Sequence, residues 1–141
     1  MLSNIISSLY FKLVVWFSRI HTAVLYVSRG RFMNSLLGLN MLLLSTRGRY
    51  TGHSRYTPLL YIKIGERYYC VASFGGNDNH PQWFLNLMAD PEVKLLIKRN
   101  HLTAIAHVTS GQERETTWQK LVEYYPNFAK YQNRSSRQIP V

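Results

Sequence analysis

Residues 42–55 read LLLSTRGRYTGHSR, an apolar run of strand character that leads directly into a loop with two glycines and three arginines. Glycine lets a loop turn several backbone N–H groups toward one point, and such a concave row of donors attracts anions. Arginine adds a permanent charge and bidentate recognition of phosphate or carboxylate. The stretch therefore predicts an anion-binding turn after a buried strand. From these residues alone, an ordinary solvated hairpin loop is the alternative.

The charge of the chain is unevenly distributed. Its 141 residues include 17 basic and 7 acidic ones, which gives a formal net charge of +10, and eight basic residues precede the first acidic residue, Glu66. A field of one sign points to an anionic partner such as lipid headgroups, a phosphorylated cofactor or nucleic acid. Nucleic acid is the least favoured, because the aromatic residues do not alternate with the arginines as a stacking platform requires.

The composition indicates one folded domain, since 46% of the residues are hydrophobic. Cys70 is the single cysteine, so no internal disulfide can form and nothing argues for an oxidising compartment. The five histidines show no metal-ligand spacing, and we therefore expect no metal site.

Residues 3–27 read as a helix, because apolar residues recur at steps of three and four positions. Lys12 and Arg19 interrupt the run, which is therefore too short to span a bilayer. Trp16 and Phe17 beside these charges suit a helix that lies on an anionic membrane surface, and packing on its own domain or in a homodimer is the alternative. We divide the chain into an N-terminal amphipathic extension, residues 1–20, and a domain, residues 21–141. The expected location is cytoplasmic, at the inner face of the membrane if the helix binds there.

The rest of the pattern is typical of a small, mainly antiparallel α+β barrel. We expect strands over residues 41–45, 55–64, 67–73, 93–98 and 102–108, and a further strand that begins at 138. Pro58 marks an edge or a bulge in the second of these strands. Helices are expected over 81–89 and 111–124, with Ser110 as the N-cap of the latter and Glu113 at its capping-box position. Residues 74–79 and 125–133 are expected to be loops.

A series of short motifs runs through residues 21–141 in a specific order. They are a helix at 21–26, Gly30-Arg31, Leu43-Leu44 before Gly48-Arg49 and Gly52, Arg55 with Pro58-Leu59, Val71-Ala72-Ser73 with Gly75-Gly76, His80-Pro81 with Trp83 and Asn86-Leu87, and Tyr125-Pro126 through Arg137 to Ile139-Pro140-Val141. Together they resemble the deazaflavin-dependent nitroreductase family, also called deazaflavin-dependent quinone reductases. The resemblance implies a split β-barrel and the deazaflavin coenzyme F(420), whose tail carries a phosphodiester and several glutamates. FMN or another flavin is the alternative cofactor.

The resemblance also assigns residues to the site. The phosphate and tail of the coenzyme would be held by Arg49, Thr51 and Arg55. The deazaflavin ring would lie against Pro58, Ala72, Ser73, Gly75 and Gly76. The pocket would be closed by Trp83 and Asn86. The hydroxyl groups that could serve the reaction, by donating to the acceptor oxygen as it gains charge, are those of Ser73, Tyr125 and Tyr131.

The implied activity is hydride transfer from the reduced coenzyme to a quinone, nitroaromatic or similar apolar acceptor, with the protein orienting the two rings and excluding water. Phe128 stands where family members that reduce nitro compounds have a tyrosine, which favours quinones. One alternative is a flavin-binding protein of the same fold. A second, from a different class, is a non-catalytic module that binds a membrane surface or another anion.

Overall fold

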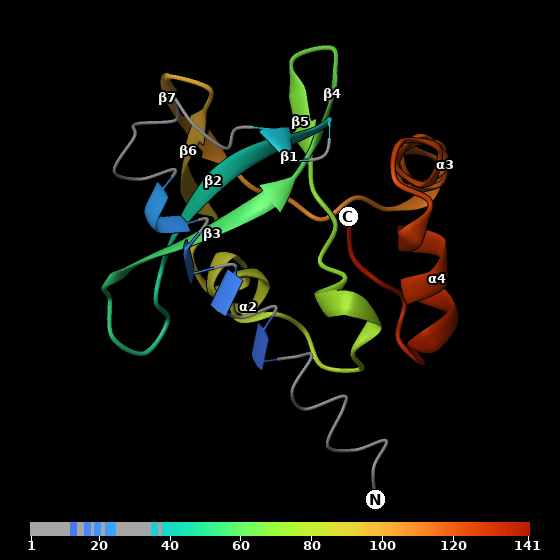
Figure 1. The fold of residues 1–141 in the computed structure, drawn as a ribbon, viewed down its shortest axis with the longest axis horizontal. Helices are drawn as coiled ribbons and strands as arrows, with labels where there is room; N and C mark the ends of the chain where they lie inside the picture. Colours follow the sequence, from blue (N-terminus) through green and yellow to red (C-terminus); the bar gives the residue numbers. More distant parts are fainter. Residues whose placement is uncertain (1–11, 14–15, 18, 21, 25–34, 37) are drawn as a thin grey trace, which may run out of the picture.

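The computed structural model describes residues 12–13, 16–17, 19–20, 22–24, 35–36 and 38–141 (Figure 1). Residues 3–11 of the predicted N-terminal helix and the basic motif at residues 29–31 lie outside the described residues. The described residues between positions 12 and 24 have helical backbone geometry. The extension at residues 1–20 as a unit stays a prediction.

The central strand of the larger sheet is β2, Leu39–Arg47. It pairs antiparallel with β3, Ser54–Leu60, on one side and with β6, Glu92–Ile97, on the other. The outer pairs join β6 to β7, Asn100–Ile105, and β1, Ser35–Leu36, to the start of β2. Leu42 and Leu44 face the main core, whereas Leu43 is buried with Leu96 on the opposite face. The apolar run of β2 is therefore continuous because both of its faces are buried.

A second, two-stranded sheet consists of β4, Ile62–Ile64, and β5, Arg67–Tyr69. The prediction of one strand over residues 55–64 is wrong, because the chain changes sheets at Tyr61. The backbone N–H of Tyr61 donates to the carbonyl of Asn40 at 3.2 Å, and its side chain is buried in the main core. Pro58 lies in β3, which pairs only with β2 among the described strands, so the predicted edge position is confirmed.

The strand predicted over residues 67–73 ends at Tyr69, because the segment that follows bonds to the C-terminal segment instead. The N–H of Ala72 donates to the carbonyl of Pro140 at 2.9 Å. Val71 packs in a second core with α3 and α4, while Ala72 packs in the main core beneath α2. The chain therefore passes between the two cores immediately before the 3₁₀ turn η1, Phe74–Gly76. The mixed α+β class with antiparallel sheets is confirmed, and the described strands do not close into a barrel.

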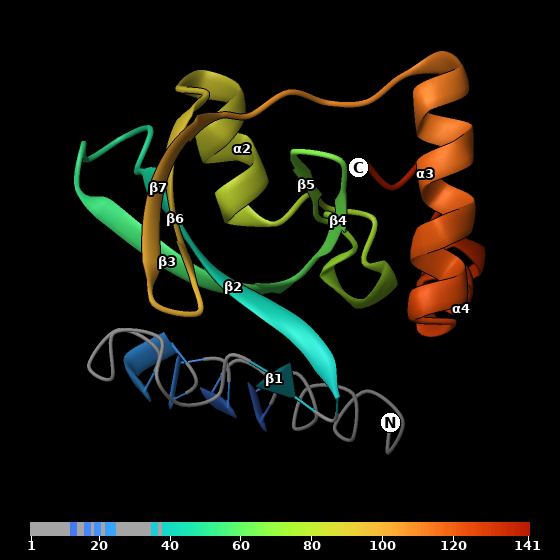
Figure 2. The same cartoon turned by 90° about the horizontal axis from the view of Figure 1, so that it is seen from above.

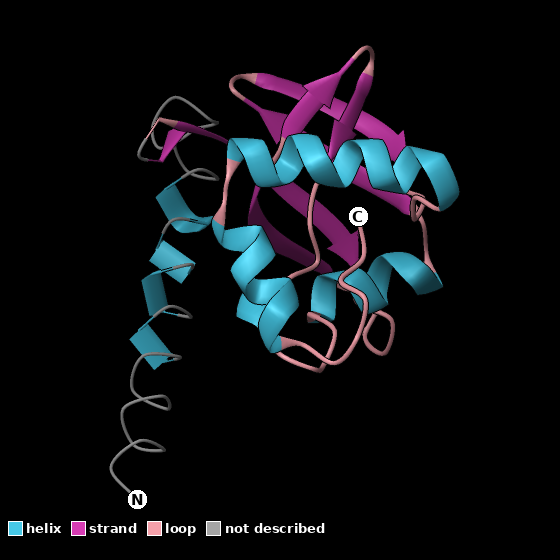
Figure 3. Cartoon of the chain, turned by 90° about the vertical axis from the view of Figure 1, so that its right-hand side faces the viewer, coloured by secondary structure: helices cyan, strands magenta, loops and turns pink. Residues whose placement is uncertain are grey.

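The helices are α2, Gln82–Ala89, α3, Gly111–Tyr124, and α4, Asn127–Arg134. Figures 2 and 3 show α2 on one side of the larger sheet and the described N-terminal residues on the other, with α3 and α4 beyond the smaller sheet. The predicted loop at residues 125–133 is wrong, since most of it forms α4. Among the described residues, no helix combines the length and hydrophobicity that a bilayer crossing requires.

The bounds predicted for α3 are confirmed, but the capping box predicted at its start does not form. Ser110 is the N-cap residue, and its side chain makes no capping hydrogen bond. Glu113 reaches outward to β5, where it pairs with Arg67 and Tyr69. A charged tertiary partner has therefore replaced the local partner that the sequence pattern suggested.

Candidate functional site

The β2–β3 turn folds tightly on itself. The N–H of Gly48 donates to His53 O at 2.8 Å, and the N–H of Gly52 donates to Gly48 O at 2.7 Å. Gly52 has a φ of +70°, which favours glycine, and a Cβ on Gly48 would lie 2.9 Å from Thr51 Oγ1 and 3.2 Å from His53 O, so a side chain there would force its neighbours to shift. Because these two N–H groups are used inside the turn, they do not form the predicted row of free backbone donors. The predicted anion recognition would therefore depend on side chains.

Arg49 is held against α2 by amide groups. Its Nη1 donates to Asn86 Oδ1 at 3.0 Å, its Nη2 donates to Gln82 Oε1 at 2.9 Å, and its backbone N–H donates to the same Asn86 oxygen at 3.2 Å. Asn86 is only 5% exposed and donates to Thr46 Oγ1 at 3.4 Å, which fixes its amide. These partners of Arg49 are neutral, so the guanidinium is fixed in position while its positive charge is not cancelled by them.

The other two predicted tail-binding residues lie in the same turn. Arg55 Nη2 donates to Thr51 Oγ1 at 3.4 Å, and both side chains are exposed. Predicted coenzyme-binding residues Arg49, Thr51 and Arg55 thus share one turn, which Arg49 joins to Asn86 of α2. A site with two guanidinium groups and a hydroxyl suits a phosphate or carboxylate ligand.

A second group of predicted residues surrounds η1. Gly75 and Gly76 have φ values of +64° and +85°. A Cβ on Gly76 would lie 2.7 Å from the carbonyl oxygen of Tyr131, whereas one on Gly75 would meet nothing within 4 Å. Phe74 also has a left-handed φ of +47°, which is a strained conformation for an aromatic residue. The turn that follows Ser73 therefore touches the backbone of α4.

The two predicted catalytic tyrosines lie together on α4 and just before it. The hydroxyls of Tyr125 and Tyr131 are 3.5 Å apart, and their ring centroids are 6.4 Å apart. Phe128 packs against both rings and is buried in the second core. Gly76, Tyr125 and Tyr131 therefore form one cluster, and Ser73 precedes Gly76 in the same turn, where its carbonyl accepts from the N–H of Gly76 at 2.9 Å.

Arg137 is a residue of this cluster to which the sequence assigned no role. Its Nη2 donates to the carbonyls of Ala72 and Ser73 at 3.0 and 3.2 Å, and its Nε donates to that of Asn77 at 3.0 Å. Its Nη1 lies 3.3 Å from His80 Nδ1, whose pKa is lowered by burial and by the neighbouring arginine charge. One side chain thus holds the backbone on both sides of η1.

The neighbouring residues Asp78 and Ser136 strengthen the same connection. The carboxylate of Asp78 accepts from the N–H of Ser136 at 2.7 Å and from its hydroxyl at 2.9 Å. The bond from the backbone N–H is the main reason that the pKa of Asp78 lies below its usual value. The segment that follows α4 therefore fixes both η1 and the loop that leads into α2.

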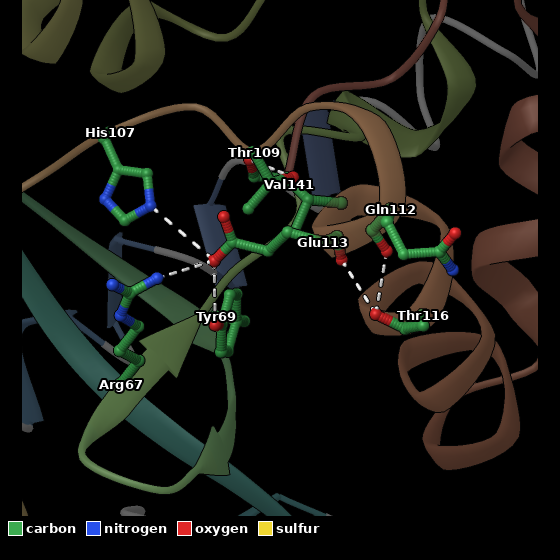
Figure 4. A network of polar contacts seen from close by, with 8 residues as sticks. All are labelled: Arg67, Tyr69, His107, Thr109, Gln112, Glu113, Thr116 and Val141. Atoms are coloured by element: carbon green, nitrogen blue, oxygen red, sulfur yellow. Dashed lines mark hydrogen bonds and ion pairs between the residues drawn. The ribbon is translucent and has the colours of Figure 1, made fainter.

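A separate polar cluster joins α3 to β5 (Figure 4). One oxygen of Glu113 accepts from Arg67 Nη1 at 2.8 Å and from the Tyr69 hydroxyl at 3.0 Å, and it lies 3.8 Å from His107 Nε2. The tyrosine hydrogen bond, followed by the arginine, lowers the pKa of Glu113. None of these residues belongs to the predicted site. The cluster ties the second core to the smaller sheet.

The remaining predicted residues connect the two groups. Ala72 and Trp83 line an apolar cavity beneath α2, and Pro58 is half-buried opposite Leu43 in the β2–β3 pair. Figures 1 and 2 show α2 between the β2–β3 turn and η1. Within the described part of the chain, no group of three or more His, Cys, Asp or Glu side chains is placed to hold a metal ion.

Comparison with known proteins relates this arrangement to a described family. Residues 16–141 match the family model described as F420H(2)-dependent quinone reductase. An F420H(2)-dependent quinone reductase of Mycobacterium tuberculosis strain H37Rv is 36% identical over 127 residues, which cover 87% of this chain and 85% of the relative.

Two solved structures are similar in fold and sequence. An F420-H2 dependent reductase (FDR-A) has a TM-score of 0.66 and 38% identity, over 71% of this chain and 89% of the other. A protein described as a domain-swapped dimer has a TM-score of 0.68 and 31% identity, over 86% of this chain and 92% of the other.

Proposed function

The chain belongs to the F420H(2)-dependent quinone reductase family, and we propose that it transfers hydride from reduced coenzyme F(420) to an apolar quinone at the site between the β2–β3 turn, η1 and α4. The chain is accordingly an oxidoreductase whose cofactor is coenzyme F(420). When bound, the coenzyme supplies the hydride. The protein binds and orients the two rings, excludes water and stabilises the charge that develops on the acceptor.

The observation that carries the proposal is the fixed cation of Arg49. Its guanidinium is oriented by the neutral amides of Gln82 and Asn86, so its geometry is set while its charge stays available for an anionic tail. Arg55 and Thr51 add an exposed cation and a hydroxyl from the same turn. This donor set fits a phosphodiester, because charge-assisted hydrogen bonds from guanidinium groups are the strongest that a side chain offers to phosphate.

The ring of the coenzyme would lie along the segment from Ala72 to Gly76. Gly75 leaves open space on its Cβ side, so a flat ring can approach the backbone there. Pro58 and the half-buried Trp83 would add apolar surface around it. The two antiparallel sheets, with Tyr68 of β5 packed against the main core beside the larger sheet, support our assignment of the split β-barrel architecture that the family resemblance implies.

The acceptor would lie on the side of the ring that faces α4. A quinone oxygen gains negative charge as hydride reaches the ring, and a hydroxyl donor at that oxygen lowers the barrier. The adjacent hydroxyls of Tyr125 and Tyr131 could provide that donor, and the hydroxyl of Ser73 is a further candidate. Phe128 is buried and has no hydroxyl, which supports quinones ahead of nitroaromatics as acceptors.

Coenzyme titration tests the binding site. Arg49→Gln keeps a side chain that can bond to Asn86 but removes the charge, so we expect the dissociation constant of F(420), followed by its fluorescence, to rise by about 10- to 100-fold. Arg99→Ala, in the exposed β6–β7 turn, is the matched control and should bind as the unmodified protein does. Unchanged affinity in Arg49→Gln would contradict the site. Tight binding of FMN in place of F(420) would support the flavin alternative.

We extend the proposal to the membrane surface. Leu13, Trp16 and Ile20 are exposed at helical spacing, with Trp16 63% exposed, and Lys12 and Arg19 are exposed beside them. Such a stripe flanked by basic residues suits the interface of an anionic bilayer, where a lipid-soluble quinone would be available. The enzyme would then be a cytoplasmic protein held at the inner face of the membrane.

Vesicle binding separates this idea from dimer formation. Trp16→Ser should reduce co-sedimentation with vesicles containing anionic lipid, while neutral vesicles should bind both proteins weakly. If Trp16→Ser leaves vesicle binding unchanged but converts a dimer to a monomer in light scattering, the stripe binds a second copy instead. The domain-swapped dimer among the similar structures makes that outcome a specific alternative.

A further inference from the structure

A pocket of about 580 Å³ lies between the start of α3 and the segment that follows α4, and it is partly open to solvent. Figure 2 shows α3 and α4 side by side, and Leu121 and Phe128 join the two helices through the second core. One wall of the pocket comes from the first turns of α3, and the other comes from Gln132 and residues 136–138. We call it the α3–α4 pocket. Its volume lies in the range of small-molecule sites.

The α3–α4 pocket is distinct from the candidate coenzyme site. None of the predicted coenzyme-binding or catalytic residues lines it. Ser136 and Arg137 contribute to its wall from the segment that also fixes η1. The guanidinium of Arg137 already donates to three backbone carbonyls of residues 72–77, and the negative charge of Asp78 offsets part of its charge. Recognition of an anion in this pocket would therefore depend on another cation.

Arg114 supplies that cation. In the described part of the chain no residue forms an ion pair or a hydrogen bond with its guanidinium, although burial lowers the pKa of the group. Every fully buried side-chain nitrogen of the described residues has a partner, so the unpaired N–H groups of Arg114 reach accessible space, and this side chain lines the pocket. A cation that has lost part of its hydration without gaining an acceptor is stabilised by an anionic ligand.

Trp118 fixes the guanidinium and adds apolar surface beside it. The Cζ atom of Arg114 lies 5.2 Å from the centroid of the Trp118 ring, one helical turn along α3. An arginine that lies over an aromatic ring keeps its in-plane N–H groups free for a carboxylate. Trp118 itself packs against the second core and is half-buried, so its position is set by the fold. The pocket thus presents a fork of donors next to an aromatic surface.

The charges of the wall favour a ligand with a single negative charge. Glu115 is exposed and lines the same pocket, so a carboxylate stands beside the cation of Arg114. Ser110 and Gln138 add neutral polar groups. A second negative charge on the ligand would gain little from the engaged Arg137 and would be repelled by Glu115. The wall therefore suits a monocarboxylate better than a phosphate dianion.

We propose that the α3–α4 pocket binds a small planar monocarboxylate with an apolar body, of the size of benzoate, through the guanidinium of Arg114. The carboxylate would accept two parallel hydrogen bonds from the planar fork of the arginine. The apolar body would lie against the accessible part of the Trp118 ring. This site takes neither the coenzyme nor the acceptor, and it therefore goes beyond the proposed function.

Benzoate binding to the full chain tests the proposal directly. The chain has three tryptophans, so their indole N–H resonances can be assigned individually in the nitrogen-15 spectrum. Benzoate should shift the resonance of Trp118 with a dissociation constant on the order of 1 mM. Benzamide, which has the same shape without the charge, and inorganic phosphate should each bind at least about tenfold more weakly. Absence of a benzoate-dependent shift, or equal affinity for either of the other two probes, would overturn the assignment.

Matched variants on α3 locate the site. Arg114→Gln removes the fork and its charge and should raise the dissociation constant of benzoate by at least about tenfold. Lys120→Gln makes the same change in charge at an exposed position outside the pocket and should bind benzoate as the unmodified chain does. Equal affinities in the two folded variants would refute Arg114 as the anchor.

A second pair of variants keeps the test decisive if Arg114→Gln fails to fold. Glu115→Gln removes the exposed carboxylate from the wall and should tighten benzoate binding by about two- to fivefold. Glu123→Gln is the matched control on the same helix and should leave the affinity unchanged. Unchanged affinity in both variants would contradict binding in this pocket.

Coenzyme binding provides the last arm of the experiment. Saturating F(420) should leave the benzoate dissociation constant within about twofold, since the two ligands occupy separate sites. Displacement of benzoate by the coenzyme would show one shared site and overturn the proposal. The benzoate titration needs no coenzyme, so a failure of the proposed enzyme function would leave its result intact.

Discussion

Gly76 fixes how closely the turn η1 approaches the backbone of α4. Both neighbouring glycines have positive φ, but only Gly76 is close enough for a Cβ to meet the backbone of Tyr131 at 2.7 Å. Gly75→Ala should cost about 1 to 2 kcal/mol of unfolding free energy from backbone strain alone. Gly76→Ala should cost about 1 to 3 kcal/mol more and lower kcat, because η1 must move away from α4. Urea unfolding and steady-state kinetics check this, and equal losses in the two variants would contradict it.

Arg137 acts as a positioning residue for the same turn. Arg137→Lys keeps the charge but cannot form hydrogen bonds to the carbonyls of Ala72, Ser73 and Asn77 together. We expect kcat for quinone reduction to fall by about tenfold or more through misplacement of the ring segment. The dissociation constant of the coenzyme should change by less than about threefold, since the proposed site of its tail is the β2–β3 turn. A loss of stability with unchanged kcat would limit Arg137 to a structural role.

These residues also show what a sequence can reveal. Arg49 and Asn86 were both assigned to the coenzyme site, because both lie in motifs that resemble a known family, but the contact between them was not predicted. Arg137 stands between serine and glutamine, without a local pattern that indicates its partners. Its contacts depend on the chain returning to residues about sixty positions earlier, and only tertiary structure supplies that information.

Among the elements, the number of apolar positions decided which helices the sequence predicted, since α2 has eight residues like α4 and yet was predicted. α3 has 14 residues and enough apolar positions for its periodicity to be recognised. α4 has eight residues, and Phe128 is its one fully buried side chain, so the periodic signal is too weak to distinguish it from an aromatic loop. The division of residues 55–64 into β3 and β4 was likewise hidden, because both parts have strand composition and differ only in their pairing partners.

The connection between η1 and α2 should weaken in acid. Burial and the charge of Arg137 hold the pKa of His80 below its ordinary value of 6.5, and its Nδ1 accepts from Arg137. As the pH falls below 6.5, the unfolded chain therefore takes up a proton before the folded chain does, and stability decreases. Comparison of urea midpoints between about pH 7.5 and 5.5 should show a smaller decrease for His80→Gln, which can still accept from the arginine. Parallel pH profiles for the two proteins would contradict this prediction.

For the whole molecule, the order of the motifs was more informative than any single one. The family and its coenzyme, expected from that order, are confirmed by the match over residues 16–141. The mixed α+β class is confirmed as well, whereas the division into two sheets and two cores was not predicted. That division depends on long-range pairs such as Ala72 with Pro140 and Thr109 with Val141, which leave no periodic trace in the sequence.

The net charge of +10 should make capture of the anionic coenzyme depend on salt. Raising the ionic strength from about 0.01 to about 0.15 M shortens the Debye length from about 30 to about 8 Å, which screens the distant charges but not the contacts at Arg49. We expect the association rate of F(420), measured by stopped-flow fluorescence, to fall by about tenfold, while the dissociation rate changes little.

Charge reversal at remote positions separates this long-range effect from the local site. Arg99→Glu with Lys120→Glu changes two exposed side chains outside the predicted site and lowers the net charge by four. The double variant should bind F(420) more slowly than the unmodified protein at low salt and at the same rate at high salt, because only the screened part of the field has changed. An association rate that is independent of ionic strength in both proteins would show that the basic excess serves a different partner, and anionic vesicles would then be the first to test.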